Sequence, residues 1–212
     1  MKEIRVGFIG CGSIAYGHLR KLKSMEGVRV FGVFDPKEEN VEKFGQEAGE
    51  IEVYRSDRQL VKKGKPDAVV INSPHTFHFS QIKLALENGV HVLVEKPAVV
   101  NYREARAVRR LLKKTGRVLV VGYQRHYLGP FLSVRKILQE KKLGKIIFLS
   151  GFLAQNWIAG VKKSGRVWRF DPKFAGGGQL TDSGSHFVAS LFFMTGLTPA
   201  KVFAFIDYHG MK

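Results

Sequence analysis

The sequence predicts an α/β protein: an N-terminal Rossmann fold with a doubly wound parallel sheet, followed by a smaller α+β region. Three observations support the Rossmann part. Short β-branched runs alternate with longer amphipathic segments, as in a parallel sheet covered by helices on both faces. A glycine-rich turn follows the first apolar run directly. An acidic residue ends the second run.

The elements of the first half follow this alternation. Strands are predicted over 4–10, 28–35, 67–72, 90–95 and 117–122, and helices near 13–25, 37–48, 76–88 and 101–114. A further strand and helix are predicted at 51–54 and 56–63. Asn101 and Glu104 form a predicted capping box at the start of the last of these helices.

The pattern changes after Gly122, which predicts a Rossmann domain over 1–122 and a second domain over 123–212. The second part is predicted to hold a helix at 131–140, a strand at 145–154, a loop up to 178, a helix at 183–195 and a strand at 202–208. Two helices and two strands offer little for an independent core.

Composition limits the class of protein. Hydrophobic residues are 44% and charged residues 25% of the 212, as in ordinary globular chains. No apolar run reaches the ~18 residues of a membrane-spanning helix, and no signal-peptide pattern opens the sequence. We therefore expect a cytoplasmic protein without a membrane partner. The net charge of +17 is spread in short Lys and Arg pairs, which favours a solvated basic surface over nucleic-acid binding.

The first turn carries a dinucleotide-binding pattern. Gly10, Gly12 and Ala15 form G-x-G-x-x-A between the first strand and the first helix, with Ser13 and Ile14 inside the motif. The glycines permit a tight turn and close approach of a pyrophosphate to the helix N-terminus. The single cysteine, Cys11, excludes an internal disulfide and is interpreted as a small side chain in this turn.

Asp35 ends the second strand, where a carboxylate accepts hydrogen bonds from the adenosine ribose and repels a 2′-phosphate. This favours NAD as the cofactor. Lys37, two residues further on, weakens the preference, so NADP stays open as the alternative.

Small polar groups end the strand at 67–72. Ser73 and Pro74 stop it at the edge of the sheet where such folds bind ligands, and Thr76 is a candidate cap for the next helix. His75 and His78 raise the question of a metal, but no third ligand lies nearby in the sequence, so no metal site is predicted. A packing or cofactor-edge role for the two histidines is the better hypothesis.

Two further segments suggest catalysis. Glu95 and Lys96 interrupt apolar sequence just before Pro97, and a lysine held there can donate to a substrate oxygen. In GGGQLTDSGSH (176–186), Asp182 is predicted near a helix N-cap, with His186 one turn further on. Three glycines before them allow a close pass of the backbone. A glycine loop, an ordinary cap and a core histidine remain the alternative when this stretch is considered by itself.

Taken together, these motifs resemble the glucose–fructose oxidoreductase, inositol dehydrogenase and MocA (Gfo/Idh/MocA) superfamily. The resemblance rests on the G-x-G-x-x-A turn, SPHTFH (73–78), EKP (95–97), VGYQRHY (121–127), LGKI (143–146) and GGGQLTDSGSHF (176–187). The family pattern differs at Gln124 and His126, which stand where members often have Asn and Arg, and at the small Ser183 and Ser185.

The resemblance implies NAD(P)-dependent hydride transfer between a secondary alcohol of a sugar, cyclitol or related polyol and the nicotinamide. It implies Lys96, Asp182 and His186 as the catalytic residues, with His186 as general base. Cofactor-binding residues are then expected at Gly10, Gly12, Ser13, Ile14, Asp35, Ser73, Pro74, His78, Glu95 and Lys96. Tyr123, Trp157, Trp168 and Arg169 are candidates for lining a sugar pocket, with domain packing as the alternative.

Two other functions remain open within this family: an NAD-dependent glycosidase, and a non-catalytic sugar- or nucleotide-sensing protein. The resemblance implies that 1–122 is the NAD(P)-binding domain and 123–212 a partial substrate-binding α+β domain with an incomplete open antiparallel sheet, since members of the family are longer and complete that sheet, which commonly forms a subunit interface. We therefore expect the 212 residues to be a C-terminally truncated or fragmentary member, a naturally short one being the alternative. An exposed sheet edge also predicts a homo-oligomer.

Overall fold

The computed structural model describes residues 3–206, which form two compact units. The described residues up to Tyr123, together with Ala154–Ser185, make the first unit; Gln124–Leu153 and the residues from His186 onward make the second. The region expected as one domain, 123–212, is therefore divided, because residues 154–185 pack with the sheet-containing unit.

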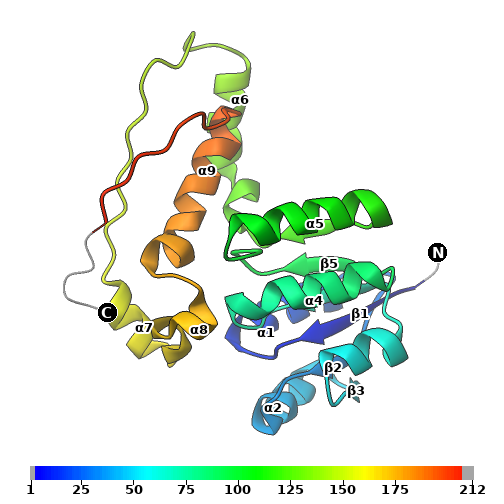
Figure 1. The fold of residues 1–212 in the computed structure, drawn as a ribbon. Coiled ribbons are helices and arrows are strands. Elements are labelled where there is room, and N and C mark those ends of the chain that lie inside the picture. Colours follow the sequence, from blue (N-terminus) through cyan, green and yellow to red (C-terminus); the bar gives the residue numbers. More distant parts are fainter. Residues whose placement is uncertain (1–2, 207–212) are drawn as a thin grey trace. The chain divides into compact units, whose positions relative to one another are not determined.

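The first unit is built on a six-stranded parallel sheet in the order β3-β2-β1-β4-β5-β6 (Figure 1). The chain runs outward from β1 to β3, then crosses to the other side of β1 for β4 to β6. The carboxyl ends of β1 and β4 flank the point where the winding reverses, which is where such sheets bind ligands. The strands are β1 (Ile4–Ile9), β2 (Val28–Phe34), β3 (Glu52–Val53), β4 (Ala68–Ile71), β5 (His91–Val94) and β6 (Leu119–Val121).

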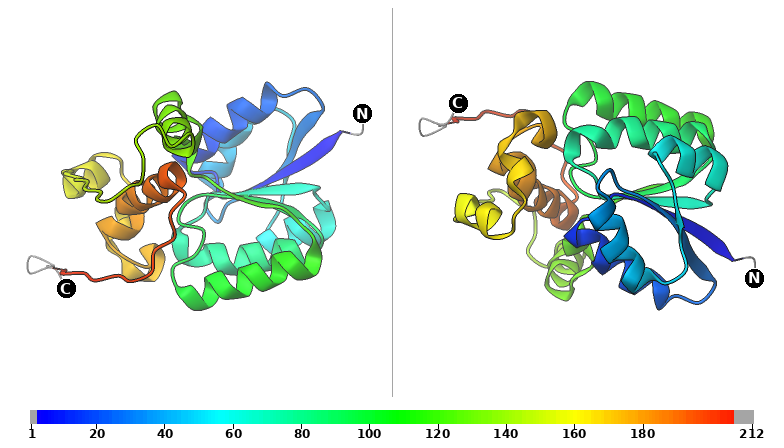
Figure 2. Two further views of the ribbon diagram at one scale, coloured as in Figure 1. Left: turned by 90° about the horizontal axis from the view of Figure 1, so that it is seen from above. Right: turned by 90° about the horizontal axis from the view of Figure 1, so that it is seen from below.

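Helices cover both faces of this sheet, α1 and α2 on one and α4 and α5 on the other (Figure 2). Buried Phe8, Leu19 and Phe44 form the core under α1 and α2, whereas Ile71, Ile82 and other aliphatic residues form the core under α4 and α5. Side chains of parallel strands are buried on both faces, which explains why the strand sequences are continuously apolar. The helices are α1 (Ser13–Lys23), α2 (Glu38–Ala48), α3 (Asp57–Gln59), η1 (Leu60–Gly64), α4 (His75–Glu87) and α5 (Tyr102–Thr115).

The predicted capping box is present at α5. The side chain of Asn101 accepts a hydrogen bond from the backbone N–H of Glu104 at 3.0 Å, and the Glu104 carboxylate reaches back to the N–H of Val100 at 3.2 Å. Thr76 does not cap α4. Its hydroxyl donates instead to the carbonyl of Lys173 at 2.7 Å, because the segment containing Lys173 packs against this end of α4.

Residues 154–178 were expected to be a loop, but they contain three short helices. These are α7 (Trp157–Lys163), η3 (Val167–Phe170) and α8 (Pro172–Ala175). Asn156 caps α7 and Asp171 caps α8 through side-chain oxygens. The glycine- and lysine-rich composition of this segment masked these local caps.

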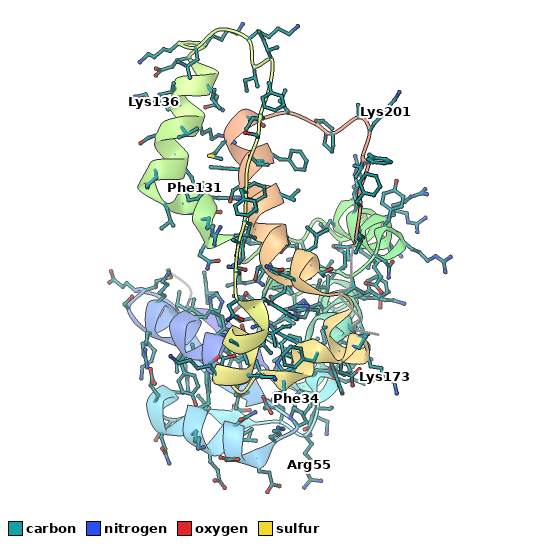
Figure 3. All side chains as sticks on the ribbon, turned by 90° about the vertical axis from the view of Figure 1, so that its left-hand side faces the viewer. Phe34, Arg55, Phe131, Lys136, Lys173 and Lys201 are labelled. Atoms are coloured by element: carbon teal, nitrogen blue, oxygen red, sulfur yellow. The ribbon has the colours of Figure 1, made fainter. Side chains whose placement is uncertain are left out.

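The second unit contains α6 (Gly129–Gln139), marked by Phe131 and Lys136 in Figure 3, and α9 (Ser185–Thr195) after its first residue. Arg135 of α6 lies over the ring of Phe193 of α9, 4.4 Å from its centre. In the described part of this unit no hydrophobic side chain is fully buried. Phe148 is 82% exposed and Phe205 92% exposed.

The strands predicted at 145–154 and 202–208 are wrong for the part of the chain that the structure describes. Residues 145–153 and 201–206 form no sheet ladder; residues 207 and 208 lie outside the described range. Both segments have strand-like composition, but a strand exists only when a neighbour supplies the hydrogen bonds. Within residues 3–206, no helix has the length and apolar character to cross a membrane.

Candidate active site

The glycine turn after β1 has the shape that close approach of a ligand requires. Gly10 has φ +90°, and a Cβ there would lie 2.9 Å from the backbone of Asn72 and Ser73, so only glycine fits. At Gly12, a Cβ would meet no atom within 4 Å, so the chain leaves open space beside the turn.

Helix α1 begins at this open space without a side-chain cap. Its N-cap is Gly12, and no acidic residue lies in the first turn. The N–H of Ala15 donates to the carbonyl of Gly12 at 2.9 Å, whereas the N–H groups of Ser13 and Ile14 lie at the positive end of the helix dipole. This arrangement fits a pyrophosphate and therefore fits a dinucleotide cofactor.

The carboxylate of Asp35 is held against the same turn. Oδ2 accepts the backbone N–H of Cys11 at 2.8 Å, and Oδ1 accepts the N–H of Lys37 at 2.9 Å and the side-chain amide of Asn40 at 3.0 Å. Asp35 thus fixes the glycine turn as well as the tip of β2. Each carboxylate oxygen can accept more than one hydrogen bond, so ribose hydroxyls can still be bound.

The lysine-bearing turn follows β5 at the same edge of the sheet. The N–H of Glu95 donates to the carbonyl of Ile71, so pairing between β4 and β5 continues up to this residue. Lys96 follows and is only 9% exposed, and the Lys96–Pro97 peptide bond is cis.

Glu95 has a partner that sequence inspection missed. Nε2 of His18 in α1 lies 2.8 Å from Oε1 of Glu95, and the imidazole donates because a carboxylate only accepts. Burial raises the pKa of Glu95, but the hydrogen bond and charge of His18, together with Lys96, outweigh burial and hold this pKa below its usual value. Nothing in the sequence around His18 marks it as a partner of a residue 77 positions away.

Lys96 is joined to Asp182 by two contacts. Its Nζ lies 2.5 Å from Oδ1 of Asp182 and 2.9 Å from the backbone carbonyl oxygen of the same residue. Both side chains are about nine-tenths buried. An ammonium group has three N–H donors, and two of them point at Asp182, so one remains for an incoming oxygen.

The second oxygen of Asp182 is also engaged. The indole N–H of Trp157 donates to Oδ2 at 2.9 Å, and Nε of Arg169 lies 3.4 Å from the same atom. Burial raises the pKa of Asp182. The hydrogen bonds from Lys96 and Trp157 and the charges of Lys96 and Arg169 more than offset burial, so this pKa lies below its usual value. Asp182 is therefore an ionised carboxylate near neutral pH.

The sequence predicts Asp182 near a helix N-cap, but in the structure it is not one. It lies inside one turn of π-helix, η4 (Leu180–Gly184), which runs directly into α9. Single π-turns are frequent at functional sites, because they redirect one side chain out of the regular helical spacing. Before this turn, the backbone at Gly176 has φ +68° and passes so near Val100 that a Cβ would clash with it.

His75 and His78 connect separate segments of the first unit through contacts with backbone carbonyl groups. His75 is 3% exposed, its Nδ1 lies 3.0 Å from the carbonyl of Ala175, and its ring stacks edge-on against Trp168 at 4.9 Å. Burial lowers the pKa of His75 to about 4, so it is neutral at pH 7. It thereby fastens the segment that leads to Asp182 onto the start of α4.

His78 is fully buried, with Nδ1 2.8 Å from the carbonyl of Pro97 and Nε2 2.8 Å from that of Ser73. It links the turns after β4 and β5 and has no exposed surface with which to touch a cofactor. The contact of His78 with the cofactor stays a prediction. In the described residues, no group of three or more His, Cys, Asp or Glu side chains is arranged to hold a metal ion.

The remaining candidates divide between the two units. Lys96, Asp182, Trp157 and Arg169 come together in the first unit, whereas Trp168 packs on His75. Tyr123 is hydrogen-bonded to Ser185; burial raises its pKa and this bond opposes the rise. His186 is the second residue of α9 and belongs to the second unit, where its carbonyl accepts the hydroxyl of Ser190 at 2.7 Å.

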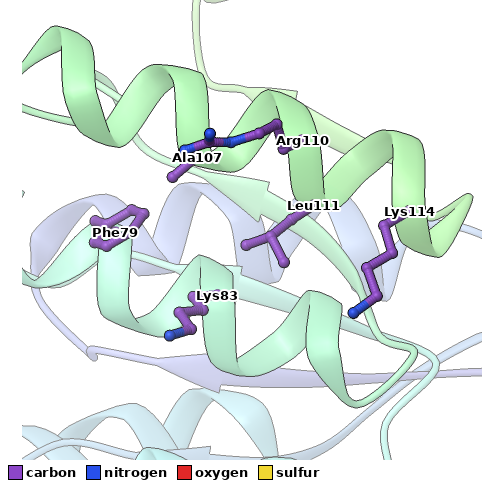
Figure 4. A pocket seen from close by; sticks show the side chains of 6 residues that line it. All are labelled: Phe79, Lys83, Ala107, Arg110, Leu111 and Lys114. Atoms are coloured by element: carbon purple, nitrogen blue, oxygen red, sulfur yellow. The ribbon is translucent and has the colours of Figure 1, made fainter.

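A separate groove lies between α4 and α5 (Figure 4). Its floor is apolar, formed by Phe79 and Leu111, and the cationic side chains Lys83, Arg110 and Lys114 surround it. None of the six lining residues is an Asp, Glu, His, Cys or Ser. The groove is therefore described apart from the lysine–aspartate pair above.

Comparison with known proteins gives matches along both parts of the chain. Residues 4–123 match the model of an oxidoreductase family with an NAD-binding Rossmann fold, and residues 131–211 match the GFO/IDH/MocA C-terminal domain. The scyllo-inositol 2-dehydrogenase (NAD(+)) of Bacillus subtilis is 30% identical over 152 residues, which is 71% of this chain and 44% of that protein. The D-glucoside 3-dehydrogenase of Escherichia coli is 25% identical and covers 93% of this chain and 56% of its own length.

The fold is shared with solved structures. Myo-inositol 2-dehydrogenase from Lactobacillus plantarum has a TM-score of 0.79 at 23% identity, covering 92% of this chain and 57% of that one. Scyllo-inositol dehydrogenase from Lactobacillus casei, solved with NAD(H) and scyllo-inositol, has a TM-score of 0.78 at 21% identity, with coverage of 92% and 57%. The chain spans about half the length of the curated relatives it matches.

Proposed function

Because the chain belongs to the GFO/IDH/MocA oxidoreductase family, we propose that it provides the cofactor site and the lysine–aspartate centre of an NAD-dependent dehydrogenase. The reaction is hydride transfer between a secondary alcohol of a sugar, cyclitol or related polyol and the nicotinamide. NAD is the preferred cofactor, because Asp35 stands where a 2′-phosphate of NADP would be repelled.

One observation supports the proposal above all others: a buried lysine is fixed by a buried carboxylate at the carboxyl edge of a Rossmann sheet. Desolvating both charges is costly, and a purely structural role would be served as well by apolar side chains. A preorganised cation at this edge stabilises negative charge on a bound oxygen.

The chain's own residues then have defined tasks. Lys96 directs its third N–H to the substrate hydroxyl oxygen and favours its alkoxide character. Asp182 holds the lysine in place. His186, four positions after Asp182, is proposed as the general base that takes the hydroxyl proton, since a neutral imidazole can accept a proton.

The cofactor is assigned to the glycine turn and to the turns that flank it. The N-terminus of α1, with Ser13 and Ile14, would bind the pyrophosphate, and Asp35 the adenosine ribose. Ser73, Pro74 and Glu95 line the same sheet edge and are proposed to border the nicotinamide half. When bound, the dinucleotide supplies the hydride acceptor.

The relatives matched are named dehydrogenases, which favours this activity over an NAD-dependent glycosidase or a sensor. We also propose a cytoplasmic homo-oligomer. The highly exposed Phe148, Phe152 and Phe205 of the second unit support association, because large exposed apolar side chains are covered in stable assemblies. Light scattering of the purified chain tests this directly.

The test of the function is calorimetric titration with NAD and NADP, followed by a screen of cyclitols and sugars for NADH formation. Tight NAD binding with turnover that disappears in His186→Ala supports the proposal. Release of a sugar aglycone without net NADH would assign a glycosidase instead. Absence of NAD binding would reject the cofactor site.

A further inference from the structure

Asp182 makes different use of its two carboxylate oxygens. Oδ1 meets the ammonium of Lys96, while Oδ2 receives the indole N–H of Trp157 at 2.9 Å. A carboxylate rotates about its Cβ–Cγ bond, so a donor on one oxygen fixes the direction of the other. The position of Oδ1 therefore depends on what holds Oδ2.

The indole is fixed before it meets Asp182. Trp157 is the first residue of α7, and the side chain of Asn156 caps that helix by accepting the N–H of Ala159 at 3.2 Å. The indole ring also meets the ring of Phe170 edge-on, with centres 5.5 Å apart and planes at 87°. These contacts leave the N–H edge of the indole directed at the carboxylate.

Arg169 cannot replace this donor as the structure stands. Its Nε lies 3.4 Å from Oδ2 but is buried without a hydrogen-bond partner among the described residues. The guanidinium contributes charge and lies 5.1 Å from the ring centre of Trp168. In the part of the chain that the structure describes, the indole is thus the directed donor on Oδ2.

We propose that Trp157 is a positioning residue: its indole N–H fixes the carboxylate of Asp182 so that Oδ1 holds Lys96 in place for the substrate oxygen. The catalytic meaning of this role rests on the proposed dehydrogenase activity, but the geometric role does not. This role is separate from the prediction that Trp157 lines a sugar pocket.

The decisive variant replaces Trp157 by 3-benzothienylalanine, which keeps the size of the ring but has sulfur in place of N–H. Incorporation of 4-fluorotryptophan at the same position retains the N–H and is the matched control. Trp157→Phe provides a genetically encoded version of the same loss. All three preserve an aromatic ring against Phe170.

The primary measurement is the ¹³C NMR titration of the Asp182 carboxyl carbon. Losing the indole donor should move its midpoint to higher pH, while the fluorotryptophan protein should titrate like the wild type. The other charged or titratable groups facing Asp182 are Lys96, Arg169 and His75, and they are unchanged in each variant. An unshifted midpoint in the benzothienylalanine protein overturns the proposal.

Steady-state kinetics separate this inference from the activity itself. For an active chain, kcat/KM on the acid side of the pH profile should fall about three- to tenfold without the N–H, as expected for one hydrogen bond. An increase in KM without a change in kcat, together with an unshifted titration midpoint, would indicate that Trp157 contacts the substrate. It would reject the positioning role. If no polyol is oxidised by the wild type, the proposed function fails, while the NMR titration still decides the role of Trp157.

Discussion

The ammonium of Lys96 lies 2.5 Å from Oδ1 of Asp182, although 86 residues separate the two in the chain. One follows the fifth strand of a parallel sheet, and the other lies in a π-helical turn at the end of a separate segment. Their side chains are buried together, so each charge depends on the other.

Lys96→Met removes the ammonium and keeps an unbranched apolar side chain one atom shorter. We expect NAD affinity to stay close to that of the wild type and kcat to fall by about 10²–10³-fold, because one preorganised donor to the reacting oxygen is lost. Calorimetry and NADH absorbance measure the two effects. Lys83→Met, at an exposed lysine of α4, is the matched control. Full turnover in Lys96→Met would remove Lys96 from the mechanism.

The Asp182 ion pair predicts loss of stability in acid. The pKa of Asp182 is lower in the folded chain than in the unfolded chain, so the pair stabilises the fold above the usual carboxyl pKa of about 4. This contribution is lost as the pH falls through the folded-state pKa. Asp182→Asn should lower the free energy of unfolding by about 3 kcal/mol at pH 7. Urea unfolding should show that the difference in this free energy between the variant and the wild type becomes smaller toward pH 3. A difference that does not change with pH would contradict this account.

His75 predicts a second acid transition, at higher pH. Its pKa is about 4 in the folded chain, below the ordinary value of 6.5, so the unfolded chain binds the proton more readily. Stability should therefore rise with pH between about 4 and 6.5. His75→Asn places an amide N–H near the position of Nδ1 and cannot titrate. The free energy of unfolding of this variant, measured by denaturation at several pH values, should change less with pH between about 4 and 6.5. If it changes as steeply as in the wild type, His75 is not the source of the pH dependence.

Asp35 predicts cofactor preference. Asp35→Ser removes the charge that would repel a 2′-phosphate. The ratio of NAD affinity to NADP affinity should therefore fall about tenfold. The reason is that two charges ~4 Å apart interact by ~1 kcal/mol in water, and by more where solvent is partly excluded. Calorimetric titration with both dinucleotides gives the ratio. The N–H of Cys11 also loses its acceptor, so a small drop in stability should accompany the change. An unaltered ratio would place the selectivity elsewhere.

Local sequence signals predicted the first unit well. Continuous apolar runs marked β1, β2, β4, β5 and β6, and the capping box at Asn101 formed as expected. Such signals act through burial on both faces of a sheet and through contacts only a few residues apart. The strands expected at 145–154 and, within the described residues, at 202–206 did not form, because strand composition is not enough without a neighbouring strand.

The sequence by itself determined the alternation of the Rossmann unit and the glycine turn, and it marked Asp35, Lys96, Asp182 and His186 as candidate site residues, the last three as a catalytic set only through the family resemblance. Only the tertiary structure decided that Trp157 and Arg169 both lie at Oδ2 of Asp182. It also decided that His18 is hydrogen-bonded to Glu95, and that His75 and His78 contact backbone carbonyls of other segments. The reason is physical. Patterns in sequence report local propensity and burial, whereas these contacts join segments far apart in the chain, and their partners are fixed only when the sheet and its surrounding helices have packed.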